Sequence, residues 1–431
     1  MQPLPTGGYR WASESEIDRI ISHLSKKANY ENAHHESNEK RGYILEVDLS
    51  YPEELHDLHQ DMPMAPEHML ISKKDISPLM SDKSPYSSTH QSKKLVGTLS
   101  NKKNYVVHYK LLKLYLQLGM KLEKVHKVLV FHQEPFMAKY IAHIASLRSK
   151  SQNTFEKNYL KKLANSCYGK MIEDVRKYKE VRICRSRSHF LRVASSPFYE
   201  CCKIYSETLV ACFLRKSVVR LKSFHAIGLS ILDYSKLHMY DLYYNYIIPS
   251  TKLSPVKGSL SIIMSDTDSF LFAFKGITAD EFLNKIADVM DFSNYPRDHK
   301  SFSAEVSGHL GYLKDEMRGQ HISGAVALKS KCYSIKSKNS KITKCKGVPK
   351  VAVRKLQYSD YKIALEKAKV YRSQFQKITS KDHSVTTTMY ERKSLSSYDD
   401  KRFYVCNIHS LPYGHYKVKK KTLSQCSKCH K

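Results

Sequence analysis

The segment from Ile262 to Phe272 constrains this chain more than any other, because two acidic residues interrupt an otherwise apolar run. Apolar residues on both sides of Ser-Asp-Thr-Asp-Ser predict two strands joined by a tight acidic turn. Asp266 and Asp268 are two positions apart, and in extended backbone such residues project to the same side. Two carboxylates this close repel each other unless a cation lies between them, and Mg²⁺ prefers oxygen ligands of this kind. The alternative is a solvated hairpin turn, in which Asp is common.

The charge balance narrows the class of partner. The 431 residues include 72 Lys and Arg against 41 Asp and Glu, which gives a formal net charge of +31. Such an excess favours nucleic acid as the partner, and the 30 tyrosines supply amphipathic rings that can stack against bases. The other interpretation is a ribosomal-type or nonspecific basic protein. The length and the hydrophobic content of 41% favour about two to four packed domains instead.

The sequence gives no sign of a membrane or export segment. No stretch approaches the roughly 18 uncharged apolar residues that span a bilayer. Residues 2–8, Gln-Pro-Leu-Pro-Thr-Gly-Gly, have neither the basic start nor the apolar centre of a signal peptide. We therefore expect no membrane partner and an intracellular location, in the nucleus or cytoplasm of a host cell. The ten cysteines are scattered, and we expect them to be reduced and mostly buried.

Periodicity gives a coarse outline of the secondary structure. We expect strands at 42–49 and 128–131, strand-like alternation over 181–225, and helices at 107–118, 135–171 with a break near 149–153, 235–246 and 279–290. Residues 73–104 are rich in Ser, Lys, Asp and Asn, and this composition predicts a loop or mobile insert. The last hundred residues or so indicate a separate, Lys-rich α+β region.

A second group of residues lies on one predicted helix. Lys161, Asn165 and Tyr168 are spaced i, i+4 and i+7, which puts them on one face, with Lys157 one turn earlier. Ammonium groups can hold a triphosphate as point charges, while the amide and the ring can lie against sugar and base. Gly169 would let the chain turn and a ligand come close to the backbone. The alternative is a solvated basic face that ends in a glycine cap.

These groups together resemble a known family. Lys-x-x-x-Asn-Ser-x-Tyr-Gly at 161–169, followed about a hundred residues later by Asp-Thr-Asp-Ser, resembles motifs B and C of family B DNA polymerases. Lys331-Cys332-Tyr333 resembles the Lys-x-Tyr motif that contacts the primer strand in that family. Four further strings resemble protein-primed polymerases of Polinton/Maverick (adintovirus-like) elements, so the similarity covers nearly the whole chain: 2–8, 42–67, 105–109 and 408–416.

The resemblance implies an α+β fold with the right-hand architecture of polymerases. It would have an antiparallel palm sheet with helices, helical fingers and an α+β thumb, and it would lack the exonuclease domain. The implied parts are a palm edge with an insert between motifs A and B in 1–104, fingers with motif B in 105–180, a palm with motif C in 181–320, and a thumb with a basic C-terminal region in 321–431.

The resemblance also implies a reaction and its partners. The reaction is two-metal nucleotidyl transfer, in which a dNTP donates a nucleotide to the 3′-hydroxyl of a DNA primer paired with a template. Asp268 is the implied principal ligand of Mg²⁺ (or Mn²⁺), with Asp266 beside it. A terminal priming protein is an implied further partner.

The other implied site residues bind the nucleotide and the DNA. Lys161 would hold the triphosphate, assisted by Lys157 and Arg148, and Asn165 and Tyr168 would line the nascent base pair. The implied DNA contacts are Lys331, Tyr333 and Gly169.

One element of the family pattern is missing. Motif A supplies another Asp ligand and lies immediately before the string Gln-Pro-Leu-Pro-Thr-Gly-Gly, which begins here at residue 2. We therefore expect an N-terminally truncated polymerase with impaired activity. Asp48 is a candidate replacement, but its spacing is shorter than that of the usual motif. The alternatives are a non-catalytic DNA-binding relic and a metal-dependent nuclease. The nuclease is disfavoured because the sequence has no exonuclease-like acidic cluster.

Three weaker features remain. His56 and His59 have the spacing of metal ligands, with surface histidines as the alternative. The Lys-rich run 329–350 predicts either a solvated loop or a contact with the DNA backbone. Four residues of the tail have a spacing that suits zinc, with unstructured tail cysteines as the alternative: Cys406, His409, Cys426 and Cys429.

Overall fold

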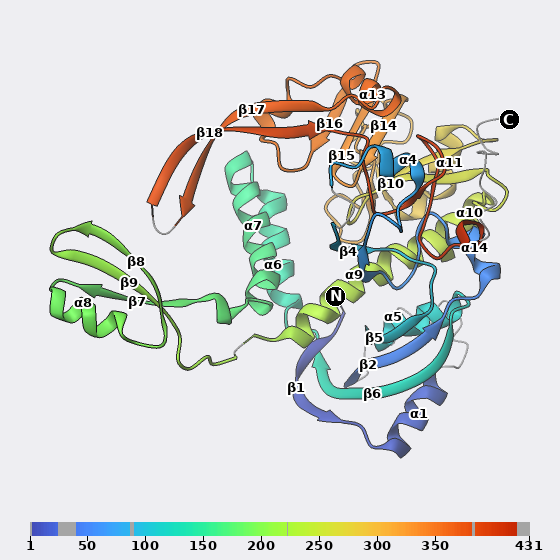
Figure 1. The fold of residues 1–431 in the computed structure, drawn as a ribbon. Coiled ribbons are helices and arrows are strands. Elements are labelled where there is room, and N and C mark those ends of the chain that lie inside the picture. The colour runs from blue at the N-terminus through green and yellow to red at the C-terminus, as the bar shows by residue number, and fades with distance from the viewer. Residues whose placement is uncertain (1, 25–39, 87–89, 222, 382–383, 420–431) are drawn as a thin grey trace. The chain divides into compact units, whose positions relative to one another are not determined.

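The computed structural model describes residues 2–24, 40–86, 90–221, 223–381 and 384–419, and its elements are drawn in Figure 1. By its internal contacts the chain forms two compact units. Unit 1 comprises Met1–Pro5, Glu134–Leu232 and Ile378–Thr388. Unit 2 comprises Thr6–Gln133, Asp233–Lys377 and Met389–Lys431.

The largest sheet of the described chain lies chiefly in unit 2. Its strand order is β1-β6-β2-β5, and β2 pairs antiparallel with both β5 and β6. The bounds are β1 Leu4–Trp11, β6 Lys121–Glu134, β2 Arg41–Ser50 and β5 Lys102–His108. Leu45, Val47 and Leu49 alternate along β2 and are fully buried, which is why this apolar segment forms a strand.

Helices complete the core around this sheet. Helix α5 (Tyr109–Gln117) follows β5 directly and buries Leu111, Leu112 and Tyr115. The same apolar core includes residues of α1 (Glu14–Leu24) and of the π-helical turn Leu242–Ile247 that continues α9 (His225–Asp241) into α10 (Ile248–Thr251). Buried tyrosines of this helical segment therefore fill much of the centre of unit 2.

The hairpin that carries the acidic turn packs onto this core. Strands β10 (Leu260–Ser265) and β11 (Phe270–Phe274) pair antiparallel. The ring of Phe272 stacks on that of Tyr243, with centroids 6.2 Å apart, and Phe274 stacks on Phe282 at 4.6 Å. Phe282 belongs to α11 (Ala279–Lys285), which Thr278 begins with a capping box. A short parallel pair follows, β12 (Met290–Asp291) with β13 (Leu313–Lys314).

The C-terminal part of unit 2 has its own core. A three-stranded antiparallel sheet, β14 (Ile322–Lys329), β15 (Cys332–Ser337) and β16 (Lys341–Cys345), packs against α13 (Tyr358–Glu366), which buries Tyr361 and Ala364; α12 (Lys350–Val353) precedes it. The hairpin of β17 (Tyr371–Lys381) and β18 (Ser384–Leu395) follows; Ile378–Thr388 of this hairpin belongs to unit 1 and the rest to unit 2. The remaining elements of this unit are short: α3 His56–His59, β3 Glu67–Ile71, α4 Pro78–Asp82, β4 Ser92–Val96, β19 Phe403–Tyr404, β20 Ser410–Leu411 and α14 Tyr416–Lys419.

Unit 1 contains a helix pair and a small sheet. Helices α6 (Ala138–Lys150) and α7 (Thr154–Met171) pack against each other. The sheet has the order β7-β9-β8 and is antiparallel. Helix α8 (Arg187–Ala194) covers one face of it through Phe190 and Val193. The strands are β7 Lys179–Cys184, β8 Tyr199–Ser206 and β9 Leu209–Arg215.

The mixed α and β composition predicted from the sequence is confirmed, whereas the layout of palm, fingers and thumb stays a prediction. The helix break near 149–153 is confirmed, because α6 ends at Lys150 and α7 begins at Thr154. The description of 73–104 as a loop or insert is wrong in part, because the segment contains α4, β4 and the start of β5. In the described ranges, no helix is both long and apolar enough to cross a bilayer.

Candidate functional site: an acidic turn held by a lysine

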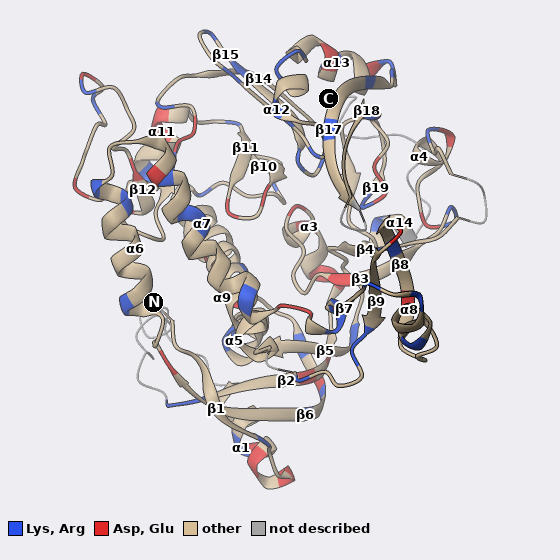
Figure 2. Ribbon diagram, turned by 90° about the vertical axis from the view of Figure 1, so that its left-hand side faces the viewer, with Lys and Arg blue, Asp and Glu red and all other residues tan. Residues whose placement is uncertain are grey.

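The predicted acidic turn forms between β10 and β11, as the acidic colour at this turn in Figure 2 shows. The backbone N–H of Asp266 donates to the carbonyl of Ser269 at 3.1 Å, and that of Asp268 donates to the carbonyl of Asp266 at 2.8 Å. Thr267 has a positive φ of 67°, a left-handed conformation that closes the turn and that non-glycine residues seldom adopt. The two carboxylates thus come from one tightly hydrogen-bonded turn.

Lys331 reaches this turn from another hairpin. It lies between β14 and β15 with a positive φ of 59°, and its ammonium forms an ion pair with the carboxylate of Asp266. The ammonium also donates to Oγ1 of Thr267 at 3.4 Å. The structure therefore brings together two of the sequence motifs, 65 residues apart in the chain.

An apolar cluster joins the same two hairpins beneath the ion pair. Tyr333 and Ile335 of β15 pack with Leu271 of β11 and with Met317. Burial, and then the negative charges of Asp266 and Glu316, raise the pKa of Tyr333. Tyr333 is 9% exposed, so its ring serves the packing of the hairpins as well as any contact with DNA.

The turn offers two carboxylates and a hydroxyl to a divalent cation. The side chain of Asp268 is exposed and, within the described part of the chain, makes no hydrogen bond or ion pair, whereas that of Asp266 is 19% exposed and held by Lys331. Mg²⁺ is commonly bound by one or two carboxylates together with water and substrate phosphates, so this donor set fits it. Among the described residues, no group of three or more His, Cys, Asp and Glu is placed to hold a metal ion by itself.

Asp48, the candidate replacement for the missing ligand, is already engaged. Its Oδ1 accepts from the backbone N–H of Asn104 at 2.8 Å and lies 2.9 Å from Nε2 of His126, while Oδ2 accepts from the ammonium of Lys103 at 3.0 Å. The hydrogen bond from Asn104, followed by those from His126 and Lys103, holds the pKa of Asp48 well below its usual range. These contacts tie β2 to β5 and β6 and give Asp48 a structural role.

The basic helix predicted as the nucleotide site is α7. Asn153 begins it by accepting from the backbone N–H of Glu156 at 2.7 Å, a regular N-cap. The helix is continuous through Lys157, Lys161, Asn165 and Tyr168, so these residues share a face; the first three are exposed and Tyr168 is half-buried. Their side chains have no hydrogen-bond or ion-pair partner within the described residues. Figure 2 shows the basic residues on α6 and α7.

One detail of the helix prediction is wrong. Gly169 does not end the helix or turn the chain, because α7 continues to Met171 and Ile172 is its C-cap. A β-carbon added at Gly169 would meet nothing within 4 Å, so the helix surface is open at this residue. Arg148 is exposed near the end of α6, before the helix break, and its role in nucleotide binding stays a prediction.

The predicted site residues fall in different units. Arg148, the residues on α7 and Gly169 belong to unit 1, while Asp266, Asp268, Lys331 and Tyr333 belong to unit 2. Each group is assembled within its own unit as described. The predicted shared cleft between Lys161 and Asp268 stays a prediction.

The interpretation of His56 and His59 as surface residues is wrong, since both are almost fully buried. Nδ1 of His59 lies 2.9 Å from the hydroxyl of Tyr51, and Nδ1 of His56 accepts from the backbone N–H of Tyr416 at 3.1 Å. His415, also buried, places its ring 5.5 Å from that of His56. His56 and His415 thus join α3 to the C-terminal segment, while His59 joins α3 to Tyr51. The pairing was not evident from the sequence, because the segments lie over 300 residues apart.

The other weak features have separate outcomes. Sγ of Cys406 lies 3.3 Å from Nδ1 of His409, but Cys426 and Cys429 lie outside the described residues, so the zinc site stays a prediction. The Lys-rich run 329–350 is not a loop throughout, because half of it forms β15 and β16, and its contact with DNA stays a prediction.

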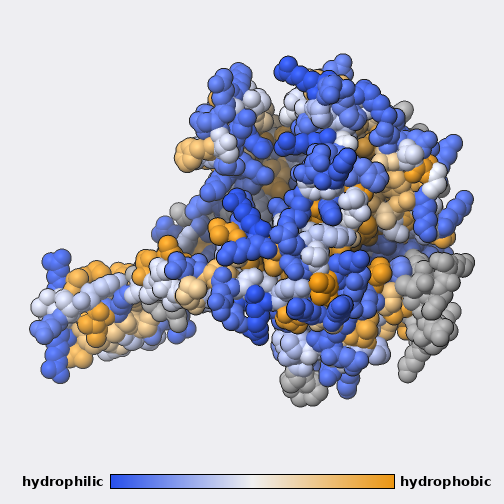
Figure 3. Space-filling model, turned by 90° about the horizontal axis from the view of Figure 1, so that it is seen from above, coloured by the Kyte–Doolittle hydropathy of each residue, from blue (hydrophilic) through white to orange (hydrophobic). Residues whose placement is uncertain are grey.

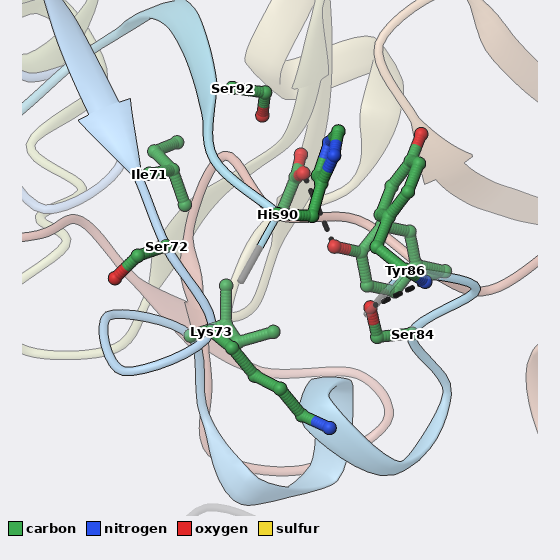
Figure 4. A pocket seen from close by; sticks show the side chains of 10 residues that line it. Ile71, Ser72, Lys73, Ser84, Tyr86, His90 and Ser92 are labelled. Atoms are coloured by element: carbon green, nitrogen blue, oxygen red, sulfur yellow. Dashed lines mark hydrogen bonds between the residues drawn. The ribbon is translucent and has the colours of Figure 1, made fainter. Parts of the chain in front are cut away.

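A small hollow in unit 2 is lined mainly by polar side chains (Figure 4). The rings of Tyr86 and His90 stack there with centroids 4.1 Å apart. Asp400, the acidic residue of the lining, is already paired with the ammonium of Lys94 and accepts from the hydroxyl of Tyr398 at 3.2 Å. The hollow therefore offers no second carboxylate for a metal ion.

Comparison with known proteins gives one kind of match. No protein-family model matches the chain, and no curated protein does. Six solved chains match in structure. One is Phi29 DNA polymerase complexed with primer-template DNA and incoming nucleotide substrates, with a TM-score of 0.42 and 12% identity over 92% of this chain and 64% of that chain.

Two further matches are complexes of the same polymerase. The complex with primer-template DNA has a TM-score of 0.41 and 12% identity, covering 89% of this chain and 63% of that chain. The complex with single-stranded DNA has a TM-score of 0.41 and 13% identity, covering 91% and 64%. This chain thus spans less than two thirds of the length of these polymerases. A likeness of this size does not fix a function.

Proposed function

We propose that this protein binds primer-template DNA and deoxynucleoside triphosphates as a DNA-directed DNA polymerase of the protein-primed family B, Polinton-like type. The observation that carries the proposal is the ion pair between Lys331 and Asp266. The two residues belong to separate sequence motifs that resemble the Lys-x-Tyr motif and motif C of that family, and a polymerase needs both at the primer end. The net charge of +31 supports DNA as the partner.

The acidic turn would act as the catalytic centre. Asp268 and Asp266 would hold Mg²⁺ or Mn²⁺, which when bound neutralises phosphate charge and activates the primer hydroxyl. Because the ammonium of Lys331 now neutralises Asp266, it would move to the primer end when a cation takes that carboxylate. Tyr333 would pack beside it.

The exposed face of α7 would bind the nucleotide. Lys161 and Lys157 would hold the triphosphate by charge, with Arg148 of α6 as a further cation. Asn165 and Tyr168 would contact the sugar and base of the incoming nucleotide. Gly169, open on its outer side, would let DNA approach the helix backbone.

Turnover by this chain alone would be slow. The turn supplies two carboxylates, and one of them is held by a lysine. The loss of a directly acting metal ligand commonly costs several kcal/mol of transition-state stabilisation, or roughly 10³-fold in rate. A terminal priming protein remains a proposed partner, and the nucleus or cytoplasm of a host cell the proposed location.

The test is primer extension by the purified chain with Mg²⁺ or Mn²⁺. We expect slow, template-directed incorporation that Asp268→Asn abolishes, while Asp298→Asn, an exposed Asp outside the turn, leaves it unchanged. Fast incorporation would contradict the proposed impairment. Incorporation that survives Asp268→Asn would contradict the role of the turn.

The second candidate is a DNA-binding protein without catalysis. The pairing of Asp266 with Lys331 favours it, because a cation must first displace the ammonium from one of the two carboxylates of the turn. It predicts that no incorporation occurs with either metal and that primer-template affinity is the same for the native chain and for Asp268→Asn. An affinity that rises with Mn²⁺ in the native chain alone would exclude it.

A further inference from the structure

Two cysteines face each other beside Lys331. Cys332 is the first residue of β15 and Cys345 the last of β16, and the two are directly paired in the antiparallel register. They are 1% and 7% exposed. Both sulfur atoms lie against the carbonyl oxygen of Ser394, at 4.0 Å for Cys332 and 3.1 Å for Cys345. The two thiols therefore share one small environment.

The backbone hydrogen bonds between β15 and β16 show whether Cys332 and Cys345 form a hydrogen-bonded or a non-hydrogen-bonded pair. The N–H of Lys346 donates to the carbonyl of Lys331 at 2.9 Å, and that of Ser337 donates to the carbonyl of Ser340 at 2.9 Å. Hydrogen-bonded and non-hydrogen-bonded pairs alternate along an antiparallel ladder. Lys331/Lys346 and Ser337/Ser340 are hydrogen-bonded pairs at the two ends of this ladder. Because the two kinds alternate, the pair next to Lys331/Lys346, which is Cys332/Cys345, is non-hydrogen-bonded.

This position suits a disulfide. Residues in a non-hydrogen-bonded pair have their α-carbons about 4.5 Å apart and their side chains at closest approach. A disulfide needs α-carbons about 4.4–6.8 Å apart. By contrast, Cys184 and Cys212 have sulfur atoms 3.8 Å apart but are diagonal neighbours, since Cys184 pairs with Val210 and Cys212 with Arg182. Diagonal α-carbons lie about 7–8 Å apart, beyond that range.

We propose that Cys332 and Cys345 are a modification site at which a peroxide forms a reversible disulfide across β15 and β16. Cys345 is the attacking sulfur: its hydrogen bond with Cys332, and then the charges of Lys329 and Arg392, lower its pKa against the effect of burial.

The chemistry balances with hydrogen peroxide as the oxidant. The thiolate of Cys345 attacks one peroxide oxygen, the O–O bond breaks, and hydroxide leaves to give a sulfenic acid. The sulfur of Cys332 then attacks the sulfenic sulfur, the S–O bond breaks, and the second oxygen leaves as water with the thiol proton. Two thiols lose two electrons and two protons, and one peroxide becomes two waters.

The disulfide would lie next to Lys331. That residue immediately precedes Cys332, and its carbonyl accepts from the N–H of Lys346, which follows Cys345. The covalent bond would therefore hold β15 to β16 one residue from Lys331, while the turn itself joins β14 to β15. The site itself does not depend on the proposed function of the protein.

The experiment treats the folded full chain with hydrogen peroxide, blocks the remaining thiols with N-ethylmaleimide in denaturant, and maps peptides by mass spectrometry. We expect a peptide pair joined through Cys332 and Cys345, lighter by two hydrogens and separated again by dithiothreitol. Cys212→Ser is the matched control and should leave the link unchanged. Quantitative alkylation of both cysteines after saturating peroxide would overturn the proposal.

A second variant tests the order of attack. In Cys332→Ser the sulfenic acid of Cys345 has no partner, so dimedone should label Cys345 and no linked peptide should form. Labelling at neither position in folded Cys332→Ser would overturn the role of Cys345. Should a variant fail to fold, as judged by circular dichroism, the peptide map of the native chain decides by itself.

Discussion

Lys331 pairs with Asp266, one of the two carboxylates that would bind a divalent cation under the proposed function. The ammonium of Lys331 neutralises Asp266, whereas the charge of Asp268, two residues later in the turn, is exposed. The ion pair is partly exposed, with 46% of the Lys331 side chain accessible, so it contributes little to stability and is easily exchanged. Under the proposed function, the ammonium of Lys331 and a divalent cation therefore compete for the carboxylate of Asp266.

Removing the ammonium should shift this competition. In Lys331→Gln we expect tighter binding of Mn²⁺ to the turn, because Asp266 is released, and weaker binding of primer-template DNA. The slope of log K against log salt should fall in magnitude by about 1, the loss of one phosphate contact. Calorimetry with Mn²⁺ and fluorescence anisotropy with DNA measure the two effects. Lys285→Gln, at an exposed lysine of α11, is the control; equal behaviour of the two variants would contradict the assigned role.

At the scale of elements, buried histidines hold α3 in place: His56 and His415 join it to the C-terminal segment, and His59 joins it to Tyr51. Nδ1 of His56 and of His415 each accept a backbone N–H, from Tyr416 and Lys417 respectively. The hydroxyl of Tyr51 accepts from the N–H of Met64 and is therefore free to donate to Nδ1 of His59. Nδ1 of His56 and of His415 is therefore an acceptor, and protonation at Nδ1 would break the hydrogen bond that each makes.

This packing makes stability depend on pH. Burial, and then the nearby His56, lowers the pKa of His59 to about 4, and burial also lowers that of His415 to about 4 despite Asp57. The unfolded chain, with ordinary histidine values near 6.5, takes up these protons first as pH falls. Stability is therefore present above about pH 6.5 and is lost progressively toward pH 4, by up to about 1.4 kcal/mol per pH unit for each histidine.

The check is the urea midpoint of unfolding at pH 7 and pH 5. We expect a lower midpoint at pH 5, and a smaller difference in His59→Gln than in the native chain. His321 is exposed and immediately precedes β14, so His321→Gln should keep the full difference between the two midpoints. A midpoint that stays constant between the two pH values would show that the buried rings accept protons without cost.

Helix α7 allows a second prediction at this scale. Gly169 lies inside the helix with open space around its α-carbon, so Gly169→Ala should stabilise the fold by roughly 0.5–1 kcal/mol through helix propensity. If DNA lies against the backbone there, the added methyl group should weaken DNA binding several-fold. Thermal unfolding and anisotropy measure both, with Ser166→Ala in the same helix as the control. Greater stability with unchanged DNA affinity would remove Gly169 from the DNA contact.

Over the whole molecule, sequence patterns predicted local structure and missed long-range pairing. The acidic hairpin follows from the apolar runs on both sides of the turn, and the start of α7 follows from its N-cap Asn153. Both causes act within a few residues of the chain. The contact of Lys331 with Asp266 and the packing of His56 on His415 depend on how distant segments meet, which periodicity does not encode. Gly169 was wrongly expected to turn the chain, because a single glycine does not end a helix whose other residues continue it, here to Met171.

The net charge of +31 predicts that binding to DNA depends strongly on salt. The surface seen in Figure 3 is largely hydrophilic, with separate hydrophobic patches, so binding to DNA should be dominated by phosphate contacts. For about six to ten such contacts, affinity should fall by roughly 10³–10⁵-fold between 50 and 200 mM salt. Anisotropy with two primer-template duplexes of unrelated sequence should give the same slope, because phosphate contacts carry no sequence information. A flat salt dependence would mean that the excess of lysine and arginine serves a partner other than nucleic acid.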